Sequence, residues 1–300
     1  MTANNDVRSD ETSDALTTFG IPDASKISAV TRKDYNDALE KFDIAVCDAI
    51  AISQASANRM AAPNYGFGTQ IFTCICSAAV AMIRAAPLSR WIRSDFPHWA
   101  LNGIAAHARA IIEGHLLLAY IMEIPASADA LSAKLDVMHL NDCTRRITLF
   151  TNLGTDDQIK KFETYADELK NRLRNNTYFC LLPKHIQKRC IDGGSPMIVS
   201  RTEMLDKVGW ERNHFRAMYD LLSQHAHILP LSFYRLETNG RGTGLENPTD
   251  RYYLQMTLLA CTDVLEKCTS EMLIAFPDTV VVRQGKKSRF SPGPRGNLPR

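Results

Sequence analysis

The chain has 300 residues, of which 45% are hydrophobic and 23% charged, and its formal net charge is +2. This balance is typical of a globular protein with ample apolar material for a core, and it excludes a chain that is disordered throughout. A charge so close to neutral also argues against a strong nucleic-acid binder and against an acidic surface.

The first predicted elements are a disordered segment and two helices. Residues 1–25 are rich in Asp, Ser, Thr and Asn, and we expect them to be disordered. A helix is expected from about Arg32 to Met60, with Thr31 as its N-cap and apolar residues spaced three and four apart. A second helix, about Thr69 to Ala86, contains the longest apolar run, Ile71–Ile83. That run is shorter than the roughly 20 residues needed to cross a bilayer, so no membrane span is predicted.

Five more helices follow, and each is bounded by a capping residue, a proline or a glycine. Their expected ranges are about His98–Glu123, Ser127 to just before Gly154, Asp156–Asn175, Trp210–His227, and Asn247-Pro248 to about Phe276. Thr155 and Gln158 have the spacing of a capping box. The stretch 178–209 is interrupted by Pro and Gly and reads as an irregular insert, and short strands are expected near Leu231–Leu236 and Val280–Arg283. The pattern predicts an all-α bundle of about seven helices with disordered termini, forming one domain over residues 26–282.

The C-terminal residues 283–300 form a basic segment. They include six Lys or Arg and no acidic residue, together with several Pro and Gly. A segment of this composition cannot bury enough apolar surface to fold, so we expect a disordered basic tail. A basic tail of this kind is most often simply solvated, and it could also contact RNA or an anionic lipid surface without sequence preference.

No metal or cofactor is predicted. Glu211–His214 is an E-x-x-H motif and Asp136–His139 is D-x-x-H, as in half-sites of di-iron bundles, but chance alone gives about as many matches. Cys74 and Cys76 form C-x-C, and no cysteine pair has the C-x-x-C spacing of a zinc knuckle. With no secretory signal in the sequence, free thiols and a cytoplasmic location are expected.

The helix expected at His98–Glu123 carries polar residues within an apolar sequence. Arg109 and Glu113 lie four residues apart, so they share one face and can form an ion pair. A charge in an apolar helix costs several kcal/mol unless it is paired or used. The pair is therefore either a buried contact that fixes helix packing, or a site in which Arg109 binds an anion and Glu113 orients it or acts as a base.

The helix expected at Trp210–His227 also carries polar residues on one face. Tyr219, Ser223 and His227 follow at successive spacings of four and share a face. His225 points away from His227 by about 200° on the helical wheel. A Ser–His pair suggests a nucleophile and a base, but no G-x-S-x-G elbow surrounds Ser223, which argues against a serine hydrolase.

These two helices resemble a pattern in uncharacterised bacterial helical proteins of the domain-of-unknown-function type. Those proteins pair an Arg-x3-Glu helix with a later Tyr-x3-Ser-x3-His helix, and the matching residues here are Arg109, Glu113, Tyr219, Ser223 and His227. The resemblance spans roughly residues 98 to 235. It implies that the two helices pair within a bundle, and it implies no established activity.

The chain also resembles the HEPN proteins, a family of small helical nucleases and nucleotide-binding modules with an Arg-x4-6-His motif on a helix. Arg109–His115 and Arg93–His98 match this spacing, whereas Ala110 stands where the family usually has a polar residue. The resemblance implies a metal-independent ribonuclease or nucleotide-transfer enzyme in a defence or toxin role. Arg109 would then hold phosphate, and His115 or His227 would act as general acid or base.

Two functions from different classes follow. The first is a non-catalytic module that binds a partner protein or a small ligand in a polar pocket between the helices at 98–123 and 210–227. The second is the HEPN-like enzyme, so the sequence leaves open whether the chain is an enzyme, which ligand it takes and whether it self-associates. Both functions use the same candidate residues: Arg109, Glu113, His115, Tyr219, Ser223 and His227.

Overall fold

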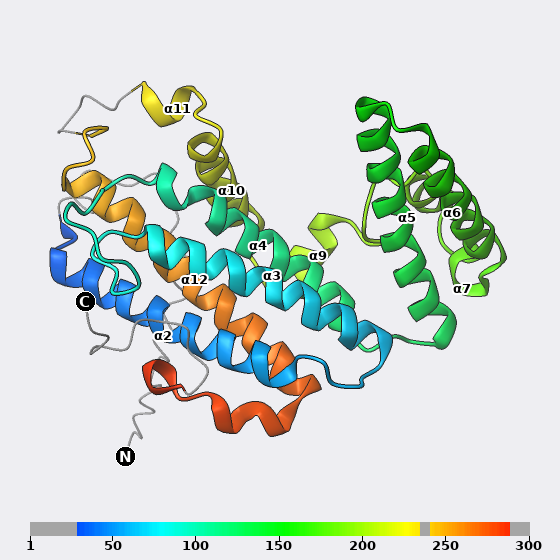
Figure 1. Cartoon of the computed structure of the whole chain (residues 1–300), viewed down its shortest axis with the longest axis horizontal. Helices are drawn as coiled ribbons and strands as arrows, with labels where there is room; N and C mark the ends of the chain where they lie inside the picture. The colour runs from blue at the N-terminus through cyan, green and yellow to red at the C-terminus, as the bar shows by residue number, and fades with distance from the viewer. Residues whose placement is uncertain (1–28, 235–240, 289–300) are drawn as a thin grey trace, which may run out of the picture.

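The computed structural model describes residues 29–234 and 241–288, and these residues are helical with no strand among them (Figure 1). Seven helices have fifteen residues or more: α2 (Arg32–Ser56), α3 (Pro63–Ala85), α4 (Asn102–Met122), α5 (Ala128–Leu153), α6 (Asp156–Asn175), α10 (Arg212–Ala226) and α12 (Pro248–Ala275). Shorter helical elements join them: α7 (Thr177–Cys180), α8 (Lys184–Ile191), α9 (Arg201–Lys207), α11 (Pro230–Phe233) and the 3-10 elements η3 (Pro277–Val282) and η4 (Gly285–Lys287). The all-α prediction is confirmed, although the described elements outnumber the seven helices expected.

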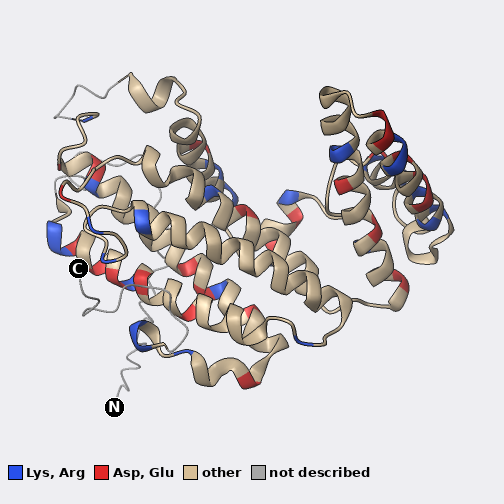
Figure 2. Ribbon diagram, viewed as in Figure 1, with Lys and Arg blue, Asp and Glu red and all other residues tan. Residues whose placement is uncertain are grey.

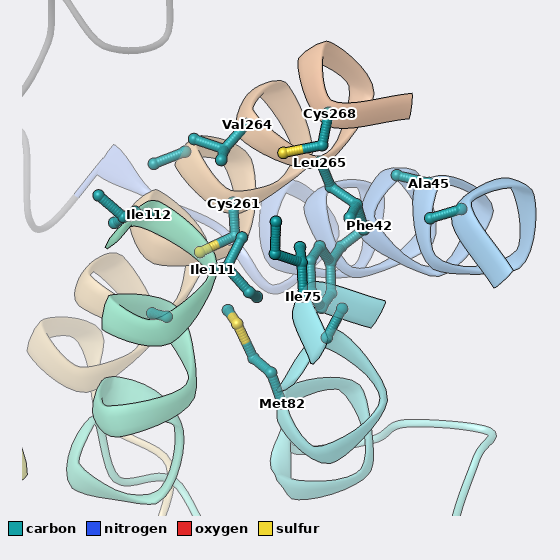
Figure 3. Packing of buried hydrophobic residues seen from close by; sticks show 14 of the residues in the cluster. Phe42, Ala45, Ile75, Met82, Ile111, Ile112, Cys261, Val264, Leu265 and Cys268 are labelled. Atoms are coloured by element: carbon teal, nitrogen blue, oxygen red, sulfur yellow. The ribbon is translucent and has the colours of Figure 1, made fainter. Parts of the chain in front are cut away.

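The main bundle is built from α2, α3, α4, α10 and α12 around one apolar core. Figure 3 shows side chains from α2, α3, α4 and α12 meeting there, among them Phe42, Ile75, Ile111 and Leu265, all of which are buried. The helices α3 and α4 pack closely, and a Cβ added at Gly114 would lie 2.7 Å from Ile75 Cγ1. The glycine therefore allows the close approach of these two helices.

A second apolar core lies among α5, α6, α7 and α8, which stand to one side of the bundle in Figure 1. Leu140, Leu173 and Phe179 are buried within it. At the edge of this core, the buried carboxylate of Asp136 accepts hydrogen bonds from Arg172. The helices α5–α8 are called the side lobe below, and the prediction of a single domain over 26–282 stays a prediction.

Two bundle helices are apolar over most of their length. Both α3 and α4 are long and apolar enough to cross a membrane, by length and composition alone, and Figure 2 shows few charged residues on them. More than half of the most apolar window of α4, 56%, is buried inside the protein, against 39% for α3. Core helices pass the same test, so the absence of a membrane span stays a prediction.

A buried carboxylate joins α2 to the connector that follows α3. Asp43 is only 4% exposed, yet it accepts hydrogen bonds from Arg90 Nη2 at 2.9 Å and Trp91 Nε1 at 2.7 Å. Arg90 Nε also donates to the other carboxylate oxygen. Arg90, the basic residue before Trp91, therefore belongs to a structural ion pair that no sequence pattern indicated.

Several predicted helix ends are confirmed. Thr31 caps α2 in a full capping box with Asp34, Ser127 caps α5, and Asn247 caps α12 through the Asp250 amide. Thr155 makes no side-chain cap hydrogen bond, so the capping box predicted there is wrong even though α6 spans the expected residues. The Thr155 backbone instead joins the left-handed turn at Gly154 that ends α5.

Both expected strands are wrong where the structure describes them. Pro230–Phe233 forms α11, because Pro at its first turn is compatible with a helix, and Pro277–Val282 forms η3. The basic tail was expected to begin at Arg283, but η4 packs against α2, where Asp48 accepts hydrogen bonds from Arg283 Nε and the Gly285 amide. The remainder of the tail, 289–300, and the segment 1–25 lie outside the described residues.

None of the eight cysteines forms a disulfide. Six are buried, whereas Cys74 on α3 and Cys180 on α7 are exposed. Burial raises the pKa of the Cys76 thiol to about 12 and raises that of Cys268 as well. Because the thiolate is the reactive form, the buried thiols are inert at neutral pH.

Candidate functional site

The polar side chains of α4 and α10 meet in one hydrogen-bonded cluster. Arg109 Nη1 lies 2.9 Å from His227 Nε2, and Arg109 Nη2 lies 3.2 Å from Glu113 Oε1. Arg109 Nη2 also donates to the Tyr219 hydroxyl at 2.6 Å, and that hydroxyl donates to Glu113 Oε1 at 2.5 Å. We call these four residues the Arg109 cluster.

The cluster lies at the surface of the helix pair, partly shielded from water. The side chains of Arg109 and Glu113 are 19% and 40% exposed, and His227 is exposed. Burial alone would lower the pKa of Arg109, but the hydrogen bond to Glu113 and the neighbouring Tyr219 oxygen hold that pKa above its ordinary value. Arg109 therefore stays a cation whose direction is fixed by two partners.

In the hydrogen bond between Arg109 and His227, Arg109 can only be the donor. A guanidinium has five donors and no acceptor, so His227 Nε2 must accept. The ring then carries its proton on Nδ1 whenever this bond is made. A ligand that competes for Arg109 would also release His227 Nε2.

Tyr219 brings a second cation to the cluster. The guanidinium carbon of Arg109 is 4.6 Å from the centre of the Tyr219 ring, and that of Arg201 on α9 is 5.0 Å from it. Phe215 stacks on the same ring with centroids 5.6 Å apart. Each cation–ring contact is worth about 0.5–1 kcal/mol at a partly exposed site, enough to orient a flexible arginine.

Two predicted site residues lie outside the cluster. Ser223 Oγ donates to the Tyr219 carbonyl oxygen at 2.6 Å, a common local bond within a helix, and makes no hydrogen bond to His227. A Ser–His nucleophile pair is thus not formed. His115 is 1% exposed, with Nε2 3.8 Å from Glu271 Oε1 and its ring 5.5 Å from that of Trp210.

His115 belongs instead to a separate groove. A hollow of about 1050 Å³ lies between α4, α9 and α12, and His115 lines it together with Glu271 and charged residues of both signs. His115 follows Arg109 by six residues, which turns its side chain away from the Arg109 face of α4. The Arg-x5-His spacing on α4 therefore does not produce an Arg–His pair in space.

The other histidine predictions are resolved by the turn of α10. His225 is buried on the side of α10 away from His227, as the helical wheel predicts. Glu211 caps α10 with its side chain and pairs with His214 at 3.3 Å, whereas Asp136 lies in the side lobe. Among the described residues, no group of three or more His, Cys, Asp or Glu is placed to hold a metal ion.

Sequence reasoning missed Arg201. It begins α9, a short helix in the stretch predicted to be irregular, and Ser200 caps that helix through Glu203 in a full capping box. The pattern Ser-x-x-Glu is visible in the sequence and would have placed a helix there. No pattern shows that this helix brings its first residue to Tyr219.

Comparison with family models, with curated proteins and with solved structures finds no match to this chain. The resemblances to domain-of-unknown-function proteins and to HEPN proteins accordingly gain no support from these comparisons.

Proposed function

We propose that the protein is a binding module that recognises an anionic ligand or partner at the Arg109 cluster and Arg201. The observation that carries the proposal is an imbalance of charge around one ring. Two guanidinium groups contact the Tyr219 ring, and among the described residues Glu113 is the one carboxylate that bonds to either of them. Arg201 forms no ion pair with any residue that the structure describes, and it is exposed.

The geometry favours a carboxylate or phosphate over other groups. Guanidinium groups present paired donors that match both anions, and a group held in place beforehand loses less entropy on binding. Glu113 and Tyr219 hold Arg109 in this way, and the Tyr219 ring orients Arg201. When Arg109 binds a ligand instead of His227, the Nε2 atom of the exposed His227 becomes available to interact with the same ligand.

We expect pyrophosphate, used as an anionic probe, to bind the full chain in isothermal titration calorimetry, more weakly as salt is raised. Arg201→Ala should weaken binding at least tenfold, because it removes a cation that serves no ion pair in the described fold. Arg109→Ala should weaken it further. The matched control is Arg93→Ala, another exposed arginine of the bundle, which should leave the affinity unchanged. Equal affinities for Arg201→Ala and the unaltered chain would exclude this site.

A metal-independent ribonuclease of the HEPN kind is the second candidate. It is favoured by one contact, the 2.9 Å approach of Arg109 Nη1 to the Nε2 atom of an exposed histidine. His227 would serve as general base or acid, since His115 is buried in another part of the fold. Arg109 would hold the phosphate.

RNA cleavage in the presence of EDTA tests this candidate. The enzyme proposal predicts that purified protein cleaves RNA without metal and that His227→Ala and Arg109→Ala each abolish cleavage. His115→Gln should retain cleavage if the protein folds, because that ring does not reach the Arg109 cluster. No cleavage by the unaltered chain, at protein concentrations where pyrophosphate binds, leaves the binding module as the function.

A further inference from the structure

A small cavity lies on the other side of α10 from the Arg109 cluster. It has a volume of about 140 Å³ and sits where α10 and α11 meet the first turns of α4 and α12. Six polar residues of the described part of the chain line it: His98, Asn102, His225, Ser232, Arg241 and Asp250. We call it the His225 cavity.

His225 is the most informative of these residues. The residue is 5% exposed, neither ring nitrogen makes a hydrogen bond to any residue that the structure describes, and neither is sealed from solvent, because the ring lines the cavity. Burial, aided by the charge of Arg241, lowers the pKa of His225 to about 4, so the ring is neutral at pH 7. The ring nitrogens therefore open onto the cavity, where a ligand can replace water as their hydrogen-bond partner.

Among the residues that the structure describes, the charges that line the cavity cancel. Arg241 Nε donates to Asp250 Oδ1 at 3.2 Å, and both side chains are largely buried. Asp250 also accepts a hydrogen bond from Asn247 Nδ2 at 2.6 Å. An anionic ligand would meet Asp250 with no spare cation, and a cationic ligand would meet Arg241. An uncharged ligand avoids both penalties.

The size and walls of the cavity define the ligand further. At about 30 Å³ for each water molecule, 140 Å³ corresponds to roughly five waters or one ring-sized molecule. Flat groups form part of the lining, namely the rings of His98, His225 and Phe233. Hydrogen-bonding groups of both kinds are present, because imidazole and carboxylate oxygens accept and amide and guanidinium groups donate.

We propose that the His225 cavity binds a small, flat, uncharged molecule that carries both hydrogen-bond donors and acceptors, such as an aromatic amide or a pyrimidine base. The ligand hydrogen-bonds to His225 and lies against the planar groups of the wall. This site is separate from the Arg109 cluster and does not depend on the function proposed for it.

Three probes of similar shape but different charge test the proposal: neutral benzamide, anionic benzoate and cationic benzamidine. Binding to the full chain is followed by saturation-transfer NMR and by the ring ¹⁵N resonances of the histidines. Benzamide should bind saturably and shift the His225 resonances, and the two charged probes should bind at least tenfold more weakly. His225→Phe keeps a flat ring without nitrogens and should weaken benzamide binding at least tenfold.

Two further variants keep this test decisive. Ser232→Val narrows the cavity without touching His225 and should also weaken benzamide binding, with the fold checked by circular dichroism. His185→Gln is the matched control, an exposed histidine on α8, and should leave binding unchanged. The proposal is overturned if benzamide does not bind, if benzoate or benzamidine binds as well, or if binding survives both cavity variants.

Discussion

Replacing Asp43 by alanine should lower the free energy of unfolding by about 3 kcal/mol. The carboxylate is buried on α2 and accepts hydrogen bonds from Arg90 and from Trp91 Nε1. Its removal leaves the indole N–H and part of the guanidinium without that partner inside the bundle. We place the loss near the lower end of the range for broken buried ion pairs, because the Arg90 side chain is 35% exposed and can turn to water.

Urea unfolding followed by tryptophan fluorescence measures this effect, because Trp91 lies at the broken contact. The control is Asp37→Ala, an exposed carboxylate on the same helix that pairs with Lys33, and it should cost less than about 0.5 kcal/mol. A loss for Asp43→Ala as small as for the control would mean that the contact between α2 and the connector contributes little to stability.

Phe179→Ala should destabilise the side lobe by about 3–5 kcal/mol and leave the main bundle folded. Phe179 is fully buried in the second core, whose residues all come from α5 to α8 and the chain just after them. All three tryptophans, Trp91, Trp99 and Trp210, lie in the main core. The two cores can therefore be observed separately, by fluorescence for the bundle and by circular dichroism for both.

We expect the variant to lose part of its helical signal at low urea, while the fluorescence transition stays at its original midpoint. Leu181→Ala is the control, since that side chain is 86% exposed in the same lobe and should have little effect. A fluorescence midpoint that moves together with the helical signal would instead support the single domain predicted from the sequence.

Most of the helices could be predicted because their signals are local. Capping residues such as Thr31 and Asn247, the glycine after α5 and the three-and-four spacing of apolar residues depend only on neighbouring sequence. The two expected strands were wrong because a local sequence signal was outweighed by the packing of the whole fold. A short run of β-branched residues such as Val280–Val282 favours a strand locally, but in the fold it continues from α12 as a 3-10 turn against α2.

The candidate site was predicted in part. Residues four apart on a helix share a face, so the sequence could place Arg109 with Glu113 on one face, and Tyr219, Ser223 and His227 on another. That the two faces meet depends on how α4 packs on α10, which no local pattern encodes. The same global packing decided that His115 turns into the groove, and that Arg201 arrives from α9.

Two exposed thiols provide sites for chemical labelling of the natural sequence. Only Cys74 and Cys180 are exposed, and they lie on opposite parts of the architecture, one on the bundle and one in the side lobe. Maleimide reagents at neutral pH would therefore modify these two positions without mutagenesis. Spin labels placed there would allow the distance between the two labels to be measured by electron paramagnetic resonance. A narrow distance distribution would indicate that the side lobe keeps a fixed orientation relative to the main bundle, and a broad one that it moves.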